Sequence, residues 1–484
     1  MKRPLWVLVA LLLAHFSIIV RHHARPLITD ELYYAAKARY FAEHHTFPRA
    51  GPREREIAAG RVWGTTDWRP PGYPVFLALA SGSDIDHDAA LRLRVTIVQF
   101  LLLAALLIAT FLFVDARARW PAALLFGLSP WPFEFANDVG PDAINAFLIG
   151  TALLIFWRTR GAAWSFVAML VASATLLFRP EMIAMAPVIA IVVCGVRQRQ
   201  SPLSHAAAEL RLQQRRLASP HSTPTWREAV AMLFAFAIVV SLQVAYRTAF
   251  TGEPGLFGPL RLTNSGAFAW TRTWLGTEKE AYDFVYAVTE GRRADLPSRA
   301  FGDAREREDV ARAVRMAHER GYSPEVDAIF AALAEKRRRE KPLLVAAVRA
   351  LNVVQLWIHL ETNPPILEAL TPVPRIIRRP ILGLLLLLKI AAVILGCIGA
   401  GQALRRWHRG EADALDALTI LMFAYVIART LLTGVVLDWR VHRYVASAWI
   451  PMLWCASIPC RGIGRLRSSK ELPDARSDLQ TPAQ

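Results

Sequence analysis

Long apolar blocks, separated by polar and basic stretches, dominate the pattern of this 484-residue chain. They cover residues 4–20, 92–114, 120–136, 141–157, 163–178, 181–196, 228–246, 380–400, 414–437 and 444–460. A helix needs roughly 20 apolar residues to cross a bilayer, and the shorter blocks must tilt or thin the membrane. The pattern therefore predicts an all-α polytopic membrane protein with about ten transmembrane helices. The first block is expected to be an uncleaved span, because Arg21-His22-His23 follows it without a small-residue cleavage site.

Positive charge is concentrated on one side of these blocks. The formal charge is +17, from 57 Lys and Arg against 40 Asp and Glu. If the first residues are cytoplasmic and the sides alternate, the basic segments share the cytoplasmic side; they are Arg117 and Arg119, Arg158 and Arg160, 197–227, 405–409 and the tail 461–484. This is the positive-inside pattern, so the charge sets topology and no nucleic-acid partner is expected. The Arg- and Ala-rich composition favours a bacterial inner membrane, with the other face periplasmic.

The opposite face receives a first loop of about residues 21–91 and a larger region of about 247–379. The larger region mixes acidic and basic residues, which is typical of solvated helices. Within it, the apolar stretch 343–360 predicts an interfacial helix rather than a span, and the proline-rich stretch 363–380 cannot be regular helix. We therefore divide the chain into four parts: a transmembrane module at 1–246, the outer region at 247–379, C-terminal spans at 380–460 and the cytoplasmic tail at 461–484.

The first outer loop carries the acidic element Thr29-Asp30-Glu31-Leu32-Tyr33-Tyr34 directly after the first span. The pattern predicts a helix that begins here and lies on the membrane surface with an apolar stripe of Leu32, Ala35, Ala36 and Tyr40. Asp30 and Glu31 would then be helix-capping acids, or they would face a reaction site. Further along stands Asp67-Trp68-Arg69-Pro70-Pro71, in which Arg69 suits a lipid phosphate or anchors an aromatic belt.

Three further points on the same face hold charges next to apolar spans. Asp142 opens the fourth block, Arg179-Pro180-Glu181 joins the fifth and sixth, and Arg443-Tyr444 precedes the last. Single ionisable residues at a membrane border are often anchors, but a group on one face indicates a functional site. We expect these residues to converge with Asp30 and Arg69.

The order of these elements resembles that of the GT-C membrane glycosyltransferases. Thr29-Asp30-Glu31-x-Tyr33-Tyr34 is similar to the Asp-Glu signature of their first loop, and the branch it resembles most contains protein O-mannosyltransferases and aminoarabinose transferases. Arg69-Pro70-Pro71-Gly-Tyr-Pro, Pro141-Asp142-Ala143, Phe178-Arg179-Pro180-Glu181 and Arg443-Tyr444 resemble later elements of that branch. The resemblance covers about residues 1–200 well and the last span weakly. This chain departs from the branch at Trp68, where an acid is usual, and at Arg69, which replaces Lys or His.

The resemblance implies an inverting hexosyl- or pentosyltransferase that moves a sugar from a polyprenyl-phosphate donor to a glycolipid, polysaccharide or protein at the periplasmic face. Asp30 is the candidate general base. The candidate phosphate ligands are Arg69 and Arg443, with Arg179 behind them. Glu31, Asp142, Glu181 and Tyr444 complete the candidate substrate-binding set. Region 247–379 matches no pattern that would identify the acceptor.

No cofactor is evident in the sequence, although a divalent metal is not excluded. The four cysteines form no CxxC pair, and the adjacent pairs His22-His23 and His44-His45 cannot both face one ion from a helix. Two other classes stay open. A transporter or flippase of a lipid-linked saccharide would use the same arginines without chemistry, although such proteins usually show related halves. A noncatalytic assembly subunit would tolerate substitution of Asp30.

Overall fold

The computed structural model describes residues 2–21, 24–27, 30–47, 70–82, 85–159, 161–179, 182, 183, 185, 187–191, 194, 226–251, 265–274, 278–289, 292, 296–358, 372–436 and 442–459. All regular structure within these ranges is helical, which confirms the all-α prediction. The α-helices are α1 (Lys2–Val20), α2 (Asp30–His44), α4 (Gly72–Ser81), α5 (Asp88–Leu112), α6 (Arg119–Leu128), α7 (Asp142–Arg158), α8 (Ala162–Ala174), α10 (Trp226–Thr251), α11 (Ser265–Thr271), α12 (Glu278–Thr289), α13 (Ala304–Arg320), α14 (Pro324–Glu340), α15 (Pro342–Ile358), α17 (Arg375–His408), α18 (Ala414–Leu431) and α19 (Trp449–Ser457). Short 3₁₀ turns are η2 (Ala116–Ala118), η3 (Trp131–Phe133), η4 (Thr175–Leu177), η6 (Ser298–Ala300) and η8 (His442–Ala448), and η7 (Leu432–Val436) is π-helical.

Five helices in the described part of the chain are long and apolar enough to cross a membrane: α1, α5, α10, α17 and α18. Other predicted blocks form shorter helical pieces. Block 120–136 is α6 followed by η3, because Ser129-Pro130 ends the helix, and block 444–460 is η8 followed by α19. The structure is thus a polytopic membrane protein, in which several blocks are interrupted by a turn or a proline. The expectation that 363–380 contains no regular helix was wrong for its last residues, because α17 begins at Arg375 and continues through Pro380.

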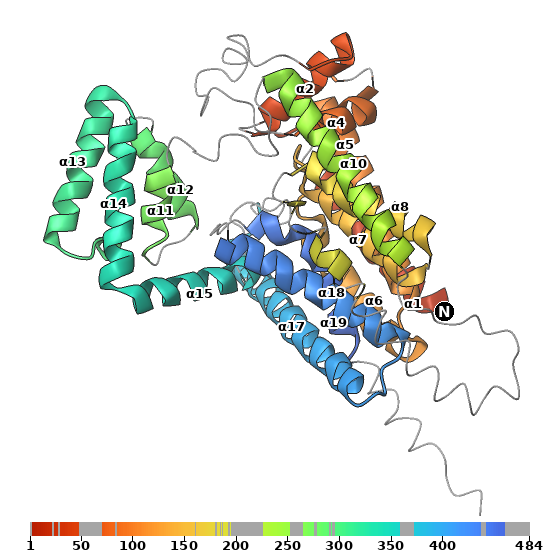
Figure 1. Cartoon of the computed structure of the whole chain (residues 1–484). Coiled ribbons are helices and arrows are strands. Elements are labelled where there is room, and N and C mark those ends of the chain that lie inside the picture. The colour runs from red at the N-terminus through yellow and green to blue at the C-terminus, as the bar shows by residue number, and fades with distance from the viewer. Residues whose placement is uncertain are drawn as a thin grey trace, which may run out of the picture.

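The apolar helices form one bundle (Figure 1). Within it α10 packs on α8, α8 on α7, α7 on α5, and α17 on both α18 and α19. Small residues allow the closest of these approaches, as is usual where helices pack in lipid. A Cβ added to Gly399 of α17 would lie 2.0 Å from the carbonyl oxygen of Cys455 in α19, and one added to Gly396 would lie 2.3 Å from the sulfur of Met452.

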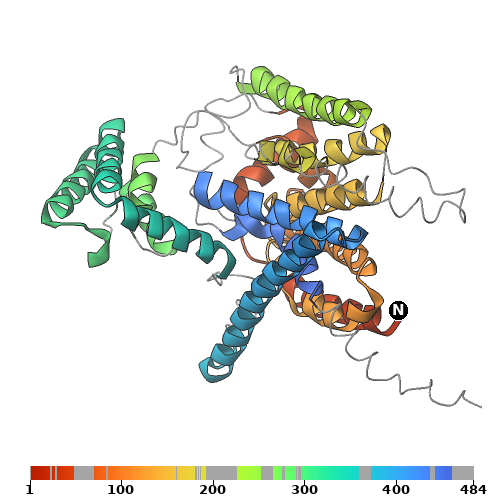
Figure 2. The ribbon, with the colours of Figure 1, turned by 60° about the horizontal axis from the view of Figure 1, so that its bottom comes forward.

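Helices α11 to α14 form a separate group with a core of their own, which we call the outer helical cluster. Figures 1 and 2 both show it beside the bundle, with α15 leading from it toward α17 and α18. Its core contains Trp270, Phe284 and Phe330. A buried ion pair joins α13 to α14, with Nε of Arg337 2.8 Å from the carboxylate of Glu306. The indole of Trp270 also donates to Glu306, over 2.7 Å, so the carboxylate connects three helices.

Candidate active site

The acidic element of the first loop begins α2, as the sequence predicts, and Asp30 is its first residue. The helix packs on α4, and the two share a core with the start of α5. The buried face differs from the predicted stripe. Tyr34, Ala35 and Ala38 are buried, whereas Leu32 is exposed. The reason is that Glu31 and Lys37 also face inward, since each finds a partner on a distant segment.

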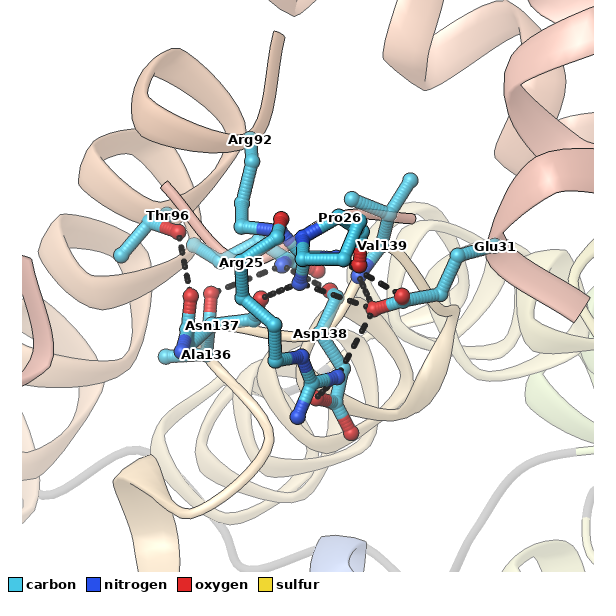
Figure 3. Close-up of polar contacts among 10 residues, drawn as sticks. Arg25, Pro26, Glu31, Arg92, Thr96, Ala136, Asn137, Asp138 and Val139 are labelled. Carbon is cyan, nitrogen blue, oxygen red and sulfur yellow. Dashed lines mark hydrogen bonds and ion pairs between the residues drawn. The ribbon is translucent and has the colours of Figure 1, made fainter. Parts of the chain in front are cut away.

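Glu31 is held by the guanidinium of Arg92 in α5 (Figure 3). The pair is bidentate: Nη1 donates to Oε1 over 2.9 Å and Nη2 donates to Oε2 over 2.7 Å. Arg92 is fully buried, and the side chain of Glu31 is only 8% exposed. The backbone N–H of Val139 adds a third short contact to Oε1, at 3.1 Å. Such a planar, two-point pair fixes orientation as well as charge, so the start of α2 is rigidly placed.

Arg92 also binds three backbone carbonyls that no helix satisfies. Its Nε donates to the carbonyl of Arg25 over 3.1 Å, Nη2 to that of Pro26 over 3.1 Å, and Nη1 to that of Asn137 over 2.9 Å. One side chain thereby joins the segment after α1, the start of α2 and the loop before α7. These segments lie far apart in sequence, and they meet at one border of the bundle (Figures 1 and 3).

Two more side chains of α5 hold the loop before α7 in place. The amide of Gln99 donates to the carbonyls of Ala136 and Asp138, in each case over 3.0 Å, and Thr96 donates to the side chain of Asn137 over 3.4 Å. Because one face of α5 supplies Arg92, Thr96 and Gln99, successive turns of a single helix shape this loop. Asp138 is thereby brought to the same place as Glu31.

Arg25 lies between the carboxylates of Glu31 and Asp138 (Figure 3). Its Nη2 is 3.4 Å from Oε1 of Glu31 and 3.5 Å from Oδ1 of Asp138. These contacts are longer than those of Arg92, and the side chain of Arg25 is 25% exposed. Arg25 is therefore the more accessible of the two arginines that contact Glu31, and its contact with Glu31 is the longer one.

A second buried ion pair lies at the start of α7. Arg179, which follows η4, donates to Asp142 over 2.6 Å, and both side chains are less than a tenth exposed. The structure thus joins two of the predicted site residues to each other. The fully buried ring of Tyr73 in α4 lies close enough to sense the same acids. Burial raises the pKa of the Tyr73 phenol, and the charges of Glu31, Tyr34, Asp138 and Asp142 raise it further.

Lys37 links α2 to α10. Its ammonium donates to the hydroxyl of Tyr246 over 3.0 Å and lies over the rings of Tyr33, Phe47 and Tyr246 at 5.4, 5.8 and 5.7 Å. Lys37 is 3% exposed, and a buried ammonium gains from aromatic faces and hydrogen bonds when it leaves water. This contact holds the C-terminal end of α10 against the helix that carries Asp30.

The remaining predicted residues have no described side chains. Arg69 and Glu181 lie outside the described residues, and Arg443 and Tyr444 belong to η8. Arg92 and Arg25 are not among the site residues predicted from the sequence. The sequence could have indicated Arg92, because it is a charged residue at the border of an apolar block, where a buried partner is expected. In the described parts of the chain, no group of three or more His, Cys, Asp or Glu side chains is arranged to hold a metal ion.

No protein-family model matches this chain, and no curated protein matches its sequence. Among solved structures it is similar to the Archaeoglobus fulgidus oligosaccharyltransferase in complex with zinc and sulfate, with a TM-score of 0.47 and 13% identity. That match covers 96% of this chain and 50% of the oligosaccharyltransferase, so this chain spans about half of that protein's length.

The chain is also similar to ArnT from Cupriavidus metallidurans, in its apo state and bound to undecaprenyl phosphate. Both matches have a TM-score of 0.32, with identities of 13% and 12%. They cover 93% and 96% of this chain, and 76% and 80% of ArnT.

Proposed function

We propose that this protein is a glycosyltransferase that moves a sugar from a polyprenyl-phosphate donor to an acceptor hydroxyl. The observation that carries the proposal is the gathering of acids and arginines from five segments at one border of a membrane bundle. Asp30, Glu31, Asp138 and Asp142 supply carboxylates, and Arg25, Arg92 and Arg179 supply fixed cations. Transfer from a lipid phosphate needs both kinds of group, because a proton must leave the acceptor while negative charge develops on the phosphate.

Asp30 is the proposed general base. The neighbouring Glu31 is buried and takes both guanidinium nitrogens of Arg92, which supports a positioning role for it rather than contact with the acceptor. Asp30 stands one residue earlier at the rigid start of α2 and is only partly buried. In the proposed step the acceptor oxygen forms a bond to the anomeric carbon, and the bond from that carbon to the phosphate oxygen breaks. The acceptor proton passes to Asp30, and the electron pair leaves with the polyprenyl phosphate.

The phosphate needs donors that can reach it. Arg25 is partly exposed, so a phosphate can reach its guanidinium, and Arg92 would still pair with Glu31 when it does. We add Arg25 to the candidate phosphate ligands Arg69 and Arg443. Arg179 is buried against Asp142, which supports a role in orienting the start of α7. Glu181 and Tyr444 stay candidate substrate contacts.

The proposed compartment follows from the charge distribution. The basic loops favour a bacterial inner membrane with the acidic element on the periplasmic side. The acceptor would then be a glycolipid, a polysaccharide or a protein at that face. The four-part division of the chain, with the outer region at 247–379 between two sets of spans, belongs to the same proposal. An inverting outcome follows if the acceptor attacks from the side opposite the departing phosphate.

The test is the Asp30→Asn variant, assayed in purified membranes with radiolabelled polyprenyl-phosphate sugars and extracted envelope acceptors. We expect loss of transfer with unchanged expression and membrane insertion, because an amide accepts no proton. The matched control is Asp86→Asn, since Asp86 lies near α2 and its side chain is 78% exposed. Activity retained by Asp30→Asn would overturn the assignment of the base. Movement of intact donor across vesicles without a new glycosidic bond would instead favour a transporter.

A further inference from the structure

Helix α15 has an exposed face that is entirely apolar. The exposed positions from 343 to 354 are Leu343, Leu344, Ala346, Ala347, Ala350, Leu351 and Val354. Leu343 is 85% exposed, and Leu351 and Val354 are about half exposed, at 46% and 48%. Because the members recur at intervals of three and four residues, they form one stripe along the helix.

The polar residues of α15 lie on the other side. Asn352 is 1% exposed, and Arg349 and Gln355 are partly buried. A helix on the surface of a water-soluble protein shows the opposite arrangement, with polar residues toward water and apolar residues toward the core. An exposed face that is more apolar than the buried face is the arrangement of a helix surrounded by acyl chains.

The neighbours of α15 place it next to lipid. It packs against α17, α18 and η8 of the membrane bundle. Trp357 near its end lies 5.0 Å from the ring of Trp449 and donates to Thr430 over 3.1 Å. The exposed positions of α17 include the apolar residues Ile376, Leu384 and Leu387, so α15 packs beside a helix that also exposes apolar side chains.

The other end of α15 marks a boundary with water. The preceding helix α14 meets α15 at an angle of 107° and ends in the charged run Glu335 to Lys341. Arg339 is 78% exposed there, and Arg338 and Arg339 both contact Glu335. Long basic side chains at such a bend can extend to the headgroups while the next helix enters the apolar layer. With 17 residues, α15 is about 25 Å long, which is too short to cross the roughly 30 Å hydrocarbon layer.

We propose that α15 is a lipid-immersed half-helix whose apolar stripe contacts acyl chains, with the α14–α15 bend at the headgroup level. It carries the outer helical cluster on a rigid arm that is fixed in the bilayer. The cluster is then held close to the membrane surface.

The test uses single cysteines in the full chain after Cys194, Cys397, Cys455 and Cys460 are replaced by alanine. An environment-sensitive fluorophore is attached at Leu343→Cys, Ala347→Cys or Leu351→Cys, and at Glu308→Cys on the exposed side of α13 as the matched control. Each protein is reconstituted in phosphatidylcholine vesicles with spin labels at shallow or deep acyl positions, and the same samples are titrated with aqueous iodide.

We expect blue-shifted emission, strong quenching by lipid spin labels and weak quenching by iodide at the three α15 positions. The control should be quenched by iodide and not by lipid. Position 351 should respond more than position 343 to the deep spin label, because position 343 adjoins the bend. Quenching of the α15 positions by iodide would overturn the proposal. Protection from both quenchers, with energy transfer between differently labelled copies, would also overturn it and assign the face to protein association.

Discussion

Removal of the Arg92 guanidinium tests whether one buried side chain holds the candidate active site together. The variant Arg92→Met keeps an unbranched apolar stem and removes the charge and all five N–H donors. Glu31 is then left as a buried carboxylate without its bidentate partner. We predict a large loss of stability, because a buried charge deprived of its partner is far more costly than an intact pair.

The magnitude follows from the contacts of Arg92. Breaking a buried ion pair by removing one partner costs about 3 to 5 kcal/mol, and the lower value applies because Arg25 stays 3.4 Å from Glu31. The carbonyls of Arg25, Pro26 and Asn137 also lose their donor, which adds about 1 kcal/mol each where water does not enter. The expected loss is therefore at least about 4 kcal/mol, a large part of the usual 5 to 15 kcal/mol of a folded protein.

The assay is thermal and denaturant-induced unfolding of the purified protein in detergent, for Arg92→Met, Glu31→Met and the double variant. The double variant should recover about 2 to 3 kcal/mol relative to Arg92→Met, because it leaves no buried charge unpaired. The free energy that Arg92 contributes through its hydrogen bonds to the three backbone carbonyls should not be recovered. A stability of Arg92→Met within about 0.5 kcal/mol of the parent protein, as for an ordinary surface change, would refute this reasoning. A double variant no more stable than Arg92→Met would do the same.

Three further predictions concern separate features. Arg25→Gln should weaken the binding of polyprenyl phosphate about tenfold, which is the effect of losing one charged hydrogen bond. A binding titration measures this, with Arg39→Gln as the control. Equal affinities of Arg25→Gln and the parent protein would contradict the role of Arg25. Gly399→Ala should cost about 1 to 3 kcal/mol in thermal unfolding, because its Cβ would lie 2.0 Å from the carbonyl oxygen of Cys455, whereas Gly401→Ala, which meets nothing, should be tolerated. The backbone N–H of Glu306, and then Lys336, lowers the pKa of Asp303 at the start of α13. Because the folded state lowers this pKa, the ionised Asp303 stabilises the fold above pH 3.8, and the stabilisation is lost as the pH falls further. Amide-exchange protection of α13 should therefore decrease below pH 3.8. It should change less with pH in Asp303→Ala.

The apolar pattern predicts the class of the fold well and the continuity of its helices less well. Block 92–114 corresponds to α5 and block 228–246 to α10, since an uninterrupted run of apolar residues in lipid can only be helical. Block 120–136 is divided, because the proline after Ser129 ends α6. The pattern did not predict the protein-facing side of α2, because a local pattern does not show that Glu31 and Lys37 have distant partners.

The sequence by itself determined that the chain is helical and spans a membrane, and it located the acidic element at the start of α2. These properties depend on local composition and periodicity, which act on each segment separately. Only the tertiary structure decided that Glu31 is buried in a bidentate ion pair while Asp30 stays partly exposed. Glu31 is paired because Arg92, 61 residues further along, is carried to it by the packing of α5. A buried charge must find a partner, but packing selects which one, and that selection distinguishes Glu31 from Asp30.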